Sequence, residues 1–213
     1  AVGLYAHWRV TSTYKKYVEV PVESGMTGRE AAERIMSAGG IRNVDIIETP
    51  GEMTDFYDPV RRQLALSSAN YHGRTVAAVG VAAHEAGHAL QHKDGYLPMH
   101  LRMQLVPTVN FAGSMLPFVM LGGLFFGAAG GLLLDIGIGC YLAITLFHLV
   151  TLPVEFDASY RAKRQLQALG ITRRGEVVGV NQTLDAAGFT YVASFLGSLL
   201  NLIYLVMLRR ERE

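Results

Sequence analysis

The chain has 213 residues, of which 50% are hydrophobic and 17% are charged, and its formal net charge is +1. This balance favours a membrane protein over a soluble domain. The basic residues are scattered or lie at the ends of apolar runs, so we expect no nucleic-acid partner. The single cysteine, Cys140, excludes an intrachain disulfide.

The N-terminal residues 1–8 are apolar and aromatic, end at Trp8, and give way to basic residues. This pattern is typical of the last turns of a membrane helix, so we interpret residues 1–8 as the remnant of an N-terminal transmembrane helix. An ordinary frayed terminus is the alternative. Residues 9–104 are expected to form a soluble α+β part.

Three short elements are predicted early in this soluble part. Thr27 and Glu30 form a capping box for a helix that is expected to end at Gly39. Residues 44–48 and 63–67 each have the pattern of a short strand. The second strand comes directly before the helix described next. We therefore expect it to be an edge strand that holds an extended peptide by main-chain hydrogen bonds.

Residues 75–92 predict a helix that carries His84, Glu85 and His88. The stretch is rich in alanine, contains no proline and follows Gly73. Positions i and i+4 of a helix lie about 40° apart, so the two imidazoles project from one face and can share a metal ion. The helix also carries small residues that would let neighbouring backbone approach closely. These are Ala82, Ala83, Ala86, Gly87 and Ala89.

This arrangement is what zinc-dependent hydrolysis requires. Two neutral imidazoles hold the ion, the ion lowers the pKa of a bound water, and the adjacent Glu85 accepts the proton as general base. A catalytic zinc ion normally has a third protein ligand. Glu155 is the best candidate, but Asp157, His92 and His148 compete with it, and these residues alone leave the choice open.

Residues 105–154 predict a transmembrane helical hairpin. No Lys, Arg, Asp or Glu occurs over 105–134, and a second apolar run follows Asp135. With a short turn near residues 130–135, both outer ends emerge on one side, which returns Glu155 to the side of the histidine pair. Two buried helices of a soluble core are the alternative.

Residues 155–188 are interpreted as the third-ligand helix and a connection, and residues 189–213 as a C-terminal transmembrane helix and tail. Basic residues before and after the hairpin, against none in its turn, place the metal site on the cytoplasmic side. The basic tail at Arg209 disagrees with this orientation if the last helix spans the membrane. Because most of the basic residues lie on the side of the metal site, we expect that side to face the cytoplasm.

Four stretches together resemble the YugP-type family of neutral zinc metallopeptidases of bacterial membranes. They are residues 57–59 (Tyr-Asp-Pro), 81–88 (ending Ala-Ala-His-Glu-Ala-Gly-His), 152–159 (Leu-Pro-Val-Glu-Phe-Asp-Ala-Ser) and 190–193 (Thr-Tyr-Val-Ala). The resemblance covers nearly the whole chain. It implies a multi-pass protein of the bacterial inner membrane.

The layout is more distantly similar to HtpX-type heat-shock membrane proteases and CAAX prenyl proteases, in which a later Glu completes the zinc site. That similarity implies Glu155 as the third ligand. Those relatives place an Asp four residues after this Glu, to orient a metal-bound histidine. Here that position is Ser159, and the nearest Asp is Asp157, on a different helical face. The outer contacts of the site therefore cannot simply be carried over.

The expected protein is an α+β membrane protein, in which a small α/β metallopeptidase unit is combined with transmembrane helices. We expect a zinc endopeptidase with zinc on His84, His88 and Glu155 and with Glu85 as general base. Tyr191 and His148 are candidates for stabilising the oxyanion. Expected partners are the bilayer, a membrane-associated protein or peptide substrate, and an oligomer or membrane partner protein. The alternatives are a catalytically idle metal-binding scaffold and a transporter component.

Overall fold

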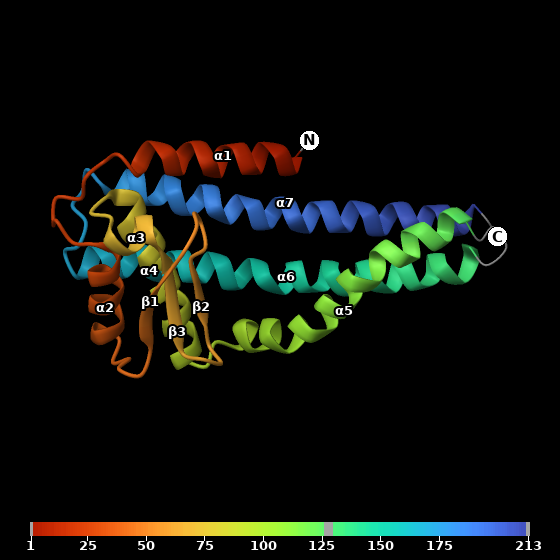
Figure 1. Cartoon of the computed structure of the whole chain (residues 1–213), viewed down its shortest axis with the longest axis horizontal. Coiled ribbons are helices and arrows are strands. Elements are labelled where there is room, and N and C mark those ends of the chain that lie inside the picture. The colour runs from red at the N-terminus through yellow and green to blue at the C-terminus, as the bar shows by residue number, and fades with distance from the viewer. Residues whose placement is uncertain (1, 126–129, 212–213) are drawn as a thin grey trace. The chain divides into compact units, whose positions relative to one another are not determined.

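Most of the chain is helical, with one small three-stranded sheet (Figure 1). The computed structural model describes residues 2–125 and 130–211. Two compact units are present: residues 3–96 with 154–190, and residues 97–153 with the segment from Tyr191 onward. The elements are α1 Val2–Tyr17, α2 Gly28–Ala38, β1 Asp45–Thr49, β2 Phe56–Asp58, β3 Gln63–Ser67, α3 Ser68–His72, α4 Val76–Lys93, α5 Leu97–Phe125, α6 Gly130–Ala168 and α7 Val177–Arg210.

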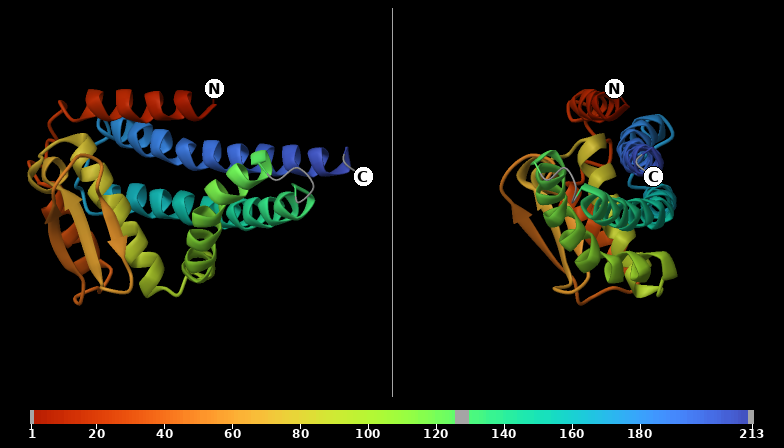
Figure 2. Two further views of the ribbon diagram at one scale, coloured as in Figure 1. Left: turned by 45° about the vertical axis from the view of Figure 1, so that its right-hand side comes forward. Right: turned by 90° about the vertical axis from the view of Figure 1, so that its right-hand side faces the viewer.

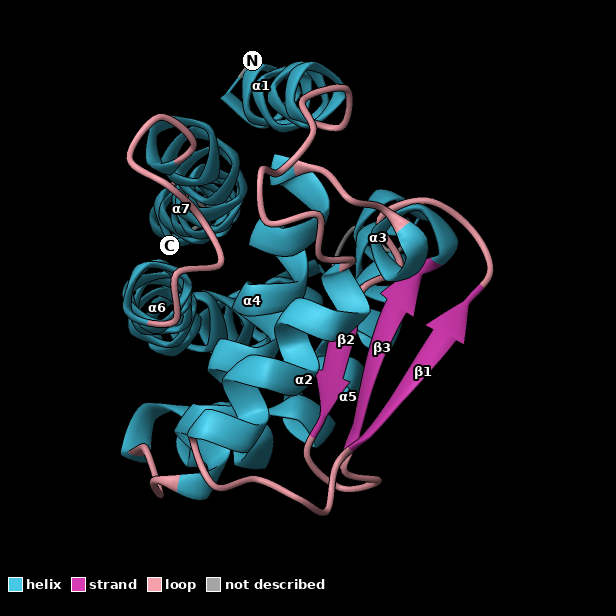
Figure 3. Ribbon diagram, turned by 90° about the vertical axis from the view of Figure 1, so that its left-hand side faces the viewer, coloured by secondary structure: helices cyan, strands magenta, loops and turns pink. Residues whose placement is uncertain are grey.

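The sheet of the first unit has the order β1-β3-β2, with β1 parallel and β2 antiparallel to β3. Figures 2 and 3 show the strands on one side of this unit and α2 and α4 on the other. The strand predicted at 63–67 is β3, but its prediction as an edge strand was wrong. β3 is central, and its residues 64–66 are fully buried. The two edges are β1 and β2, and β2 has only three residues, too few to show the alternation that identifies a strand.

The predicted capping box on α2 is confirmed. The Glu30 backbone N–H donates to Thr27 Oγ1 at 3.1 Å, and the Thr27 N–H donates to Glu30 Oε2 at 2.7 Å. α2 then ends at Ala38, before Gly39. These contacts satisfy two of the backbone donors that a helix leaves unpaired at its start.

Helix α4 is the centre of the first unit, and most of its side chains are buried. Thr75 caps it by accepting a hydrogen bond from the Ala78 N–H at 3.3 Å. The small residues allow the close approach that the sequence predicted. A Cβ atom added at Gly87 would lie 2.5 Å from the carbonyl oxygen of Ala158, on α6. The backbones of α4 and α6 therefore meet at Gly87.

The second unit contains α5 and the apolar parts of α6 and α7. The helices over residues 131–168 and 177–210 are long and apolar enough to cross a membrane by length and composition. Within this unit, Arg209 Nε donates to Asp135 Oδ1 at 2.8 Å. Residues 126–129 of the predicted hairpin lie outside the described residues. The prediction of a turn over 130–135 was wrong, because α6 already begins at Gly130; the glycines there suggested a turn, but the helix accommodates them.

Candidate metal centre

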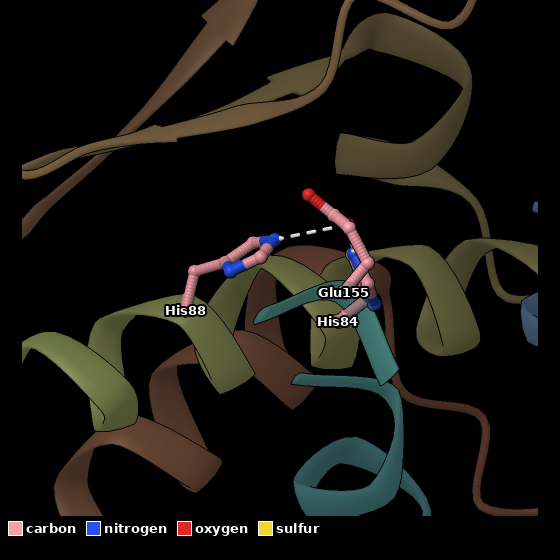
Figure 4. A group of neighbouring side chains, drawn as sticks. All are labelled: His84, His88 and Glu155. Carbon is pink, nitrogen blue, oxygen red and sulfur yellow. Dashed lines mark hydrogen bonds and ion pairs between the residues drawn. The ribbon is translucent and has the colours of Figure 1, made fainter. Parts of the chain in front are cut away.

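Helices α4 and α6 bring His84, His88 and Glu155 together within the first unit (Figure 4). Glu155 Oε2 lies 3.2 Å from His84 Nε2 and 3.5 Å from His88 Nε2. The ligand atoms of the three residues all lie within 4.8 Å of one another. A tetrahedral zinc site with bonds of about 2.1 Å separates its ligand atoms by about 3.4 Å. The donor types and their spacing therefore fit zinc.

The three side chains are largely removed from solvent. Glu155 is 1% exposed and His88 is 7% exposed. Burial raises the pKa of the Glu155 carboxyl, but its contacts with the His84 and His88 imidazoles outweigh burial, so this pKa lies below its ordinary value. Glu155 is therefore a carboxylate, which is the form that binds a cation.

The other ring nitrogen of each histidine has its own partner. His84 Nδ1 lies 3.1 Å from Ser159 Oγ, and His88 Nδ1 lies 3.0 Å from Gln91 Oε1. Ser159, four residues after Glu155 on α6, thus contacts a candidate zinc ligand. Gln91 was not among the site residues predicted from sequence. It could have been recognised as a polar residue three positions after His88 in a mostly apolar helix, where it lies on the same face as that histidine.

The competing ligand candidates have other partners. Asp157 Oδ2 accepts hydrogen bonds from Gln91 and Arg161. His92 Nδ1 lies 2.9 Å from the Tyr57 hydroxyl. His148 and Tyr191 belong to the second unit, where His148 Nδ1 lies 3.1 Å from Ser198 Oγ. His148 is thus hydrogen-bonded within the helix bundle, as polar residues of packed membrane helices often are.

The family model described as "Putative neutral zinc metallopeptidase" matches residues 1–210. The chain belongs to this family. It is also 44% identical over 210 residues to "Putative membrane protease YugP" of Bacillus subtilis (strain 168), in an alignment that covers 98% of this chain and 92% of that protein. No solved structure matches the chain. The resemblance to the YugP-type family is confirmed.

In this member of the zinc metallopeptidase family, Glu85 follows His84 directly on α4 and is 8% exposed. It is not one of the three residues whose ligand atoms converge. Glu85 is thus a buried acidic residue beside the candidate ligand His84 but is not itself one of the three candidate ligands. This placement is compatible with an acid–base role.

A cavity of about 270 Å³ lies one helical turn beyond His88 on α4. Tyr57, Arg62, His92 and Lys93 are among its lining residues. Burial raises the pKa of the Tyr57 hydroxyl, Arg62 opposes this rise and Asp58 adds to it. The phenol therefore stays protonated at neutral pH and can donate to His92.

Gly87→Ala is expected to weaken zinc binding and to lower any peptidase activity by about 100-fold, because displacements near 1 Å in a reactive site have effects of this size. The new methyl group would overlap the Ala158 carbonyl and push α6, with Glu155, away from the histidines. Zinc affinity, measured by competition with a chelator, tests this. Gly80→Ala on the same helix is the matched control, since its Cβ would meet only a Val180 methyl at 4.0 Å. Equal zinc affinity in both variants would contradict the expectation.

Proposed function

We propose that this chain is a membrane-embedded zinc-dependent endopeptidase, with zinc held by His84, His88 and Glu155. The observation that carries the proposal is the convergence of two imidazoles and one carboxylate from α4 and α6, with ligand atoms within 4.8 Å of one another. Family membership supports zinc and peptidase activity. Three protein ligands leave a fourth tetrahedral position for water, as catalytic zinc requires.

When bound, zinc supplies a Lewis acid that activates water at neutral pH and polarises a peptide carbonyl. Glu85 acts as general base, accepts the proton of the attacking water, and then donates it to the leaving amine nitrogen. His84, His88 and Glu155 hold their donor atoms on one side of the site. Burial of Glu85 and Glu155 limits competing contacts with bulk water.

The substrate is a protein or peptide in an extended conformation. β2 is one of the two edges of the sheet, so an extended segment can add to it through main-chain hydrogen bonds. Tyr57 of β2 also lines the cavity beyond His88. Peptide binding is therefore assigned to β2, in place of the strand at 63–67.

The protein acts at a membrane. The helices α6 and α7 are apolar and long enough to span it, and the Bacillus relative is described as a membrane protease. We assign the chain to the bacterial inner membrane as a multi-pass protein. Basic residues beside the predicted spans, such as Lys15, Lys16 and Arg102, orient the metal site toward the cytoplasm. Membrane-associated proteins are then the nearest substrates, and an oligomer or partner protein in the membrane is compatible with this placement.

Metal removal tests the proposed function. The full chain in detergent micelles or proteoliposomes is expected to bind one zinc ion and to cleave unfolded soluble proteins or membrane proteins from a fluorescently labelled panel. Chelation should abolish cleavage, and added Zn²⁺ should restore it, as followed by fragment release and zinc content. One zinc ion per chain without cleavage across the panel would instead support a catalytically idle scaffold. Cleavage that survives complete zinc removal would refute the proposal.

A further inference from the structure

We propose that Gln91 and Asp157 are positioning residues that hold His88 in the tautomer with its proton on Nδ1, so that Nε2 presents a lone pair to zinc. This inference rests on the proposed zinc site and adds two residues to it. Neither residue is a zinc ligand in our assignment. Their effect passes through the ring of His88.

The first step is the orientation of the Gln91 side chain, which is fully buried. Its Nε2 donates one hydrogen bond to the Val154 carbonyl oxygen at 2.7 Å and another to Asp157 Oδ2 at 2.8 Å. A backbone carbonyl and a carboxylate can only accept. Rotating the amide by 180° would place its oxygen against two acceptors. The network therefore fixes the amide in one orientation.

The second step concerns the histidine. With the Gln91 amide fixed, Oε1 faces His88 Nδ1 at 3.0 Å. An amide oxygen has no proton to give, so the hydrogen of this contact must be on Nδ1. A neutral imidazole then has its lone pair on Nε2, the nitrogen that lies 3.5 Å from Glu155 Oε2. The metal-binding nitrogen and the metal-binding carboxylate therefore face one another.

The third step is the anchoring of Asp157. Its Oδ2 also accepts from Arg161 Nε at 2.6 Å, and Arg161 Nη1 donates to Asp94 Oδ2 at 2.5 Å. The Arg161 guanidinium lies 5.8 Å from the centre of the Tyr96 ring. These contacts hold the carboxylate of Asp157 in place against Gln91. The same contacts connect α6 with the C-terminal end of α4.

The two histidines differ in this respect. His84 Nδ1 faces the Ser159 hydroxyl, which can either donate or accept. Ser159 therefore accommodates either tautomer of His84, whereas the Gln91 amide accommodates one tautomer of His88. Partners of the second ring nitrogen commonly change metal affinity or activity by about 10- to 100-fold when removed. We therefore expect loss of the Gln91 contact to His88 to weaken zinc binding more than loss of the Ser159 contact to His84.

The test uses the full-length chain in detergent micelles with ¹⁵N-labelled histidine. In the metal-free parent, the ¹⁵N shifts of His88 should report a proton on Nδ1; His88→Asn serves only to assign the signal. Gln91→Met keeps a similar volume without hydrogen bonds, so it should give a mixture of tautomers and a zinc Kd raised about 10- to 100-fold. Asp157→Ala changes a partly exposed side chain and should shift both readouts in the same direction. It keeps the test decisive where Gln91→Met fails to fold.

The matched control is Asp185→Ala. Asp185 also pairs with a cation of α6, Lys163 at 2.6 Å, and among the described residues it has no hydrogen bond or ion pair with Gln91, Asp157 or Arg161. It should leave the tautomer and the zinc Kd at parent values. The inference would be overturned if His88 of the parent carried its proton on Nε2. It would also be overturned if Gln91→Met and Asp157→Ala both kept the tautomer and the zinc Kd of the parent. Absence of zinc binding in the parent would instead refute the proposed function, since the tautomer is measured without metal.

Discussion

Glu85→Gln is expected to keep zinc bound and to lose nearly all peptide-bond hydrolysis. The substitution preserves the volume of the side chain but replaces a carboxylate with an amide, which cannot accept the proton of the attacking water. General acid–base catalysis contributes about 10²- to 10⁴-fold, so kcat should fall by that factor. Zinc should remain, because the atoms that converge belong to His84, His88 and Glu155. Zinc content per chain and kcat on an unfolded substrate are the two measurements.

Glu33→Gln is the matched control for this prediction. Glu33 lies on α2 with an exposed side chain, 4.0 Å from Arg29. The same chemical change at this position should leave both zinc content and kcat near the parent values. Parent-like turnover in Glu85→Gln would remove Glu85 from the mechanism. Zinc loss in that variant would assign it a role in metal binding.

Local features of the first unit could be predicted from sequence. The capping box of α2 and the helical spacing of His84 and His88 depend on residues within four positions of one another, so neighbouring sequence determines them. The prediction of a helix over 75–92 agrees with α4, Val76–Lys93. Its small residues also predicted a close backbone contact, which occurs at Gly87.

Features that depend on distant pairing could not be predicted this way. β3 pairs on both sides, with β1 and with the short β2, and nothing within residues 63–67 distinguishes a central strand from an edge strand. Glu155 lies 71 positions after His84, and spacing alone did not separate it from Asp157. Resemblance to known families supplied that preference. The helix contact at Gly87 then explains how α6 brings Glu155 to the histidines.

The residues that contact the candidate ligands also could not be predicted from spacing along one helix. Asp157 was excluded from the position of the orienting Asp because it lies on a different helical face from Ser159. In the structure it nevertheless reaches the site, through the buried amide of Gln91. A side chain that bridges two helices allows a residue to act from a face that does not point at the metal. Sequence spacing within one helix cannot reveal such a bridge.

Glu155→Ala is expected to abolish stoichiometric zinc binding under conditions in which the parent is saturated. The change removes the only carboxylate among the three converging residues and leaves two neutral imidazoles, so charge attraction and one bond are lost together. The zinc Kd should rise by more than the factor of about 10 to 100 that is typical when a residue hydrogen-bonded to a ligand is removed. Zinc content after dialysis against a weak chelator, together with the Kd, measures it.

Glu176→Ala separates loss of a ligand from loss of any buried carboxylate. Glu176 is 8% exposed and accepts hydrogen bonds from the backbone N–H groups of Glu23 and Arg173, away from the histidines. Its removal should lower the Tm, because two backbone donors lose their partner, and should leave zinc at the parent level. Zinc retained at full stoichiometry in Glu155→Ala would mean that another residue completes the site. In that case the approach of α6 to α4 at Gly87 serves packing, and the third ligand must be sought elsewhere in the chain.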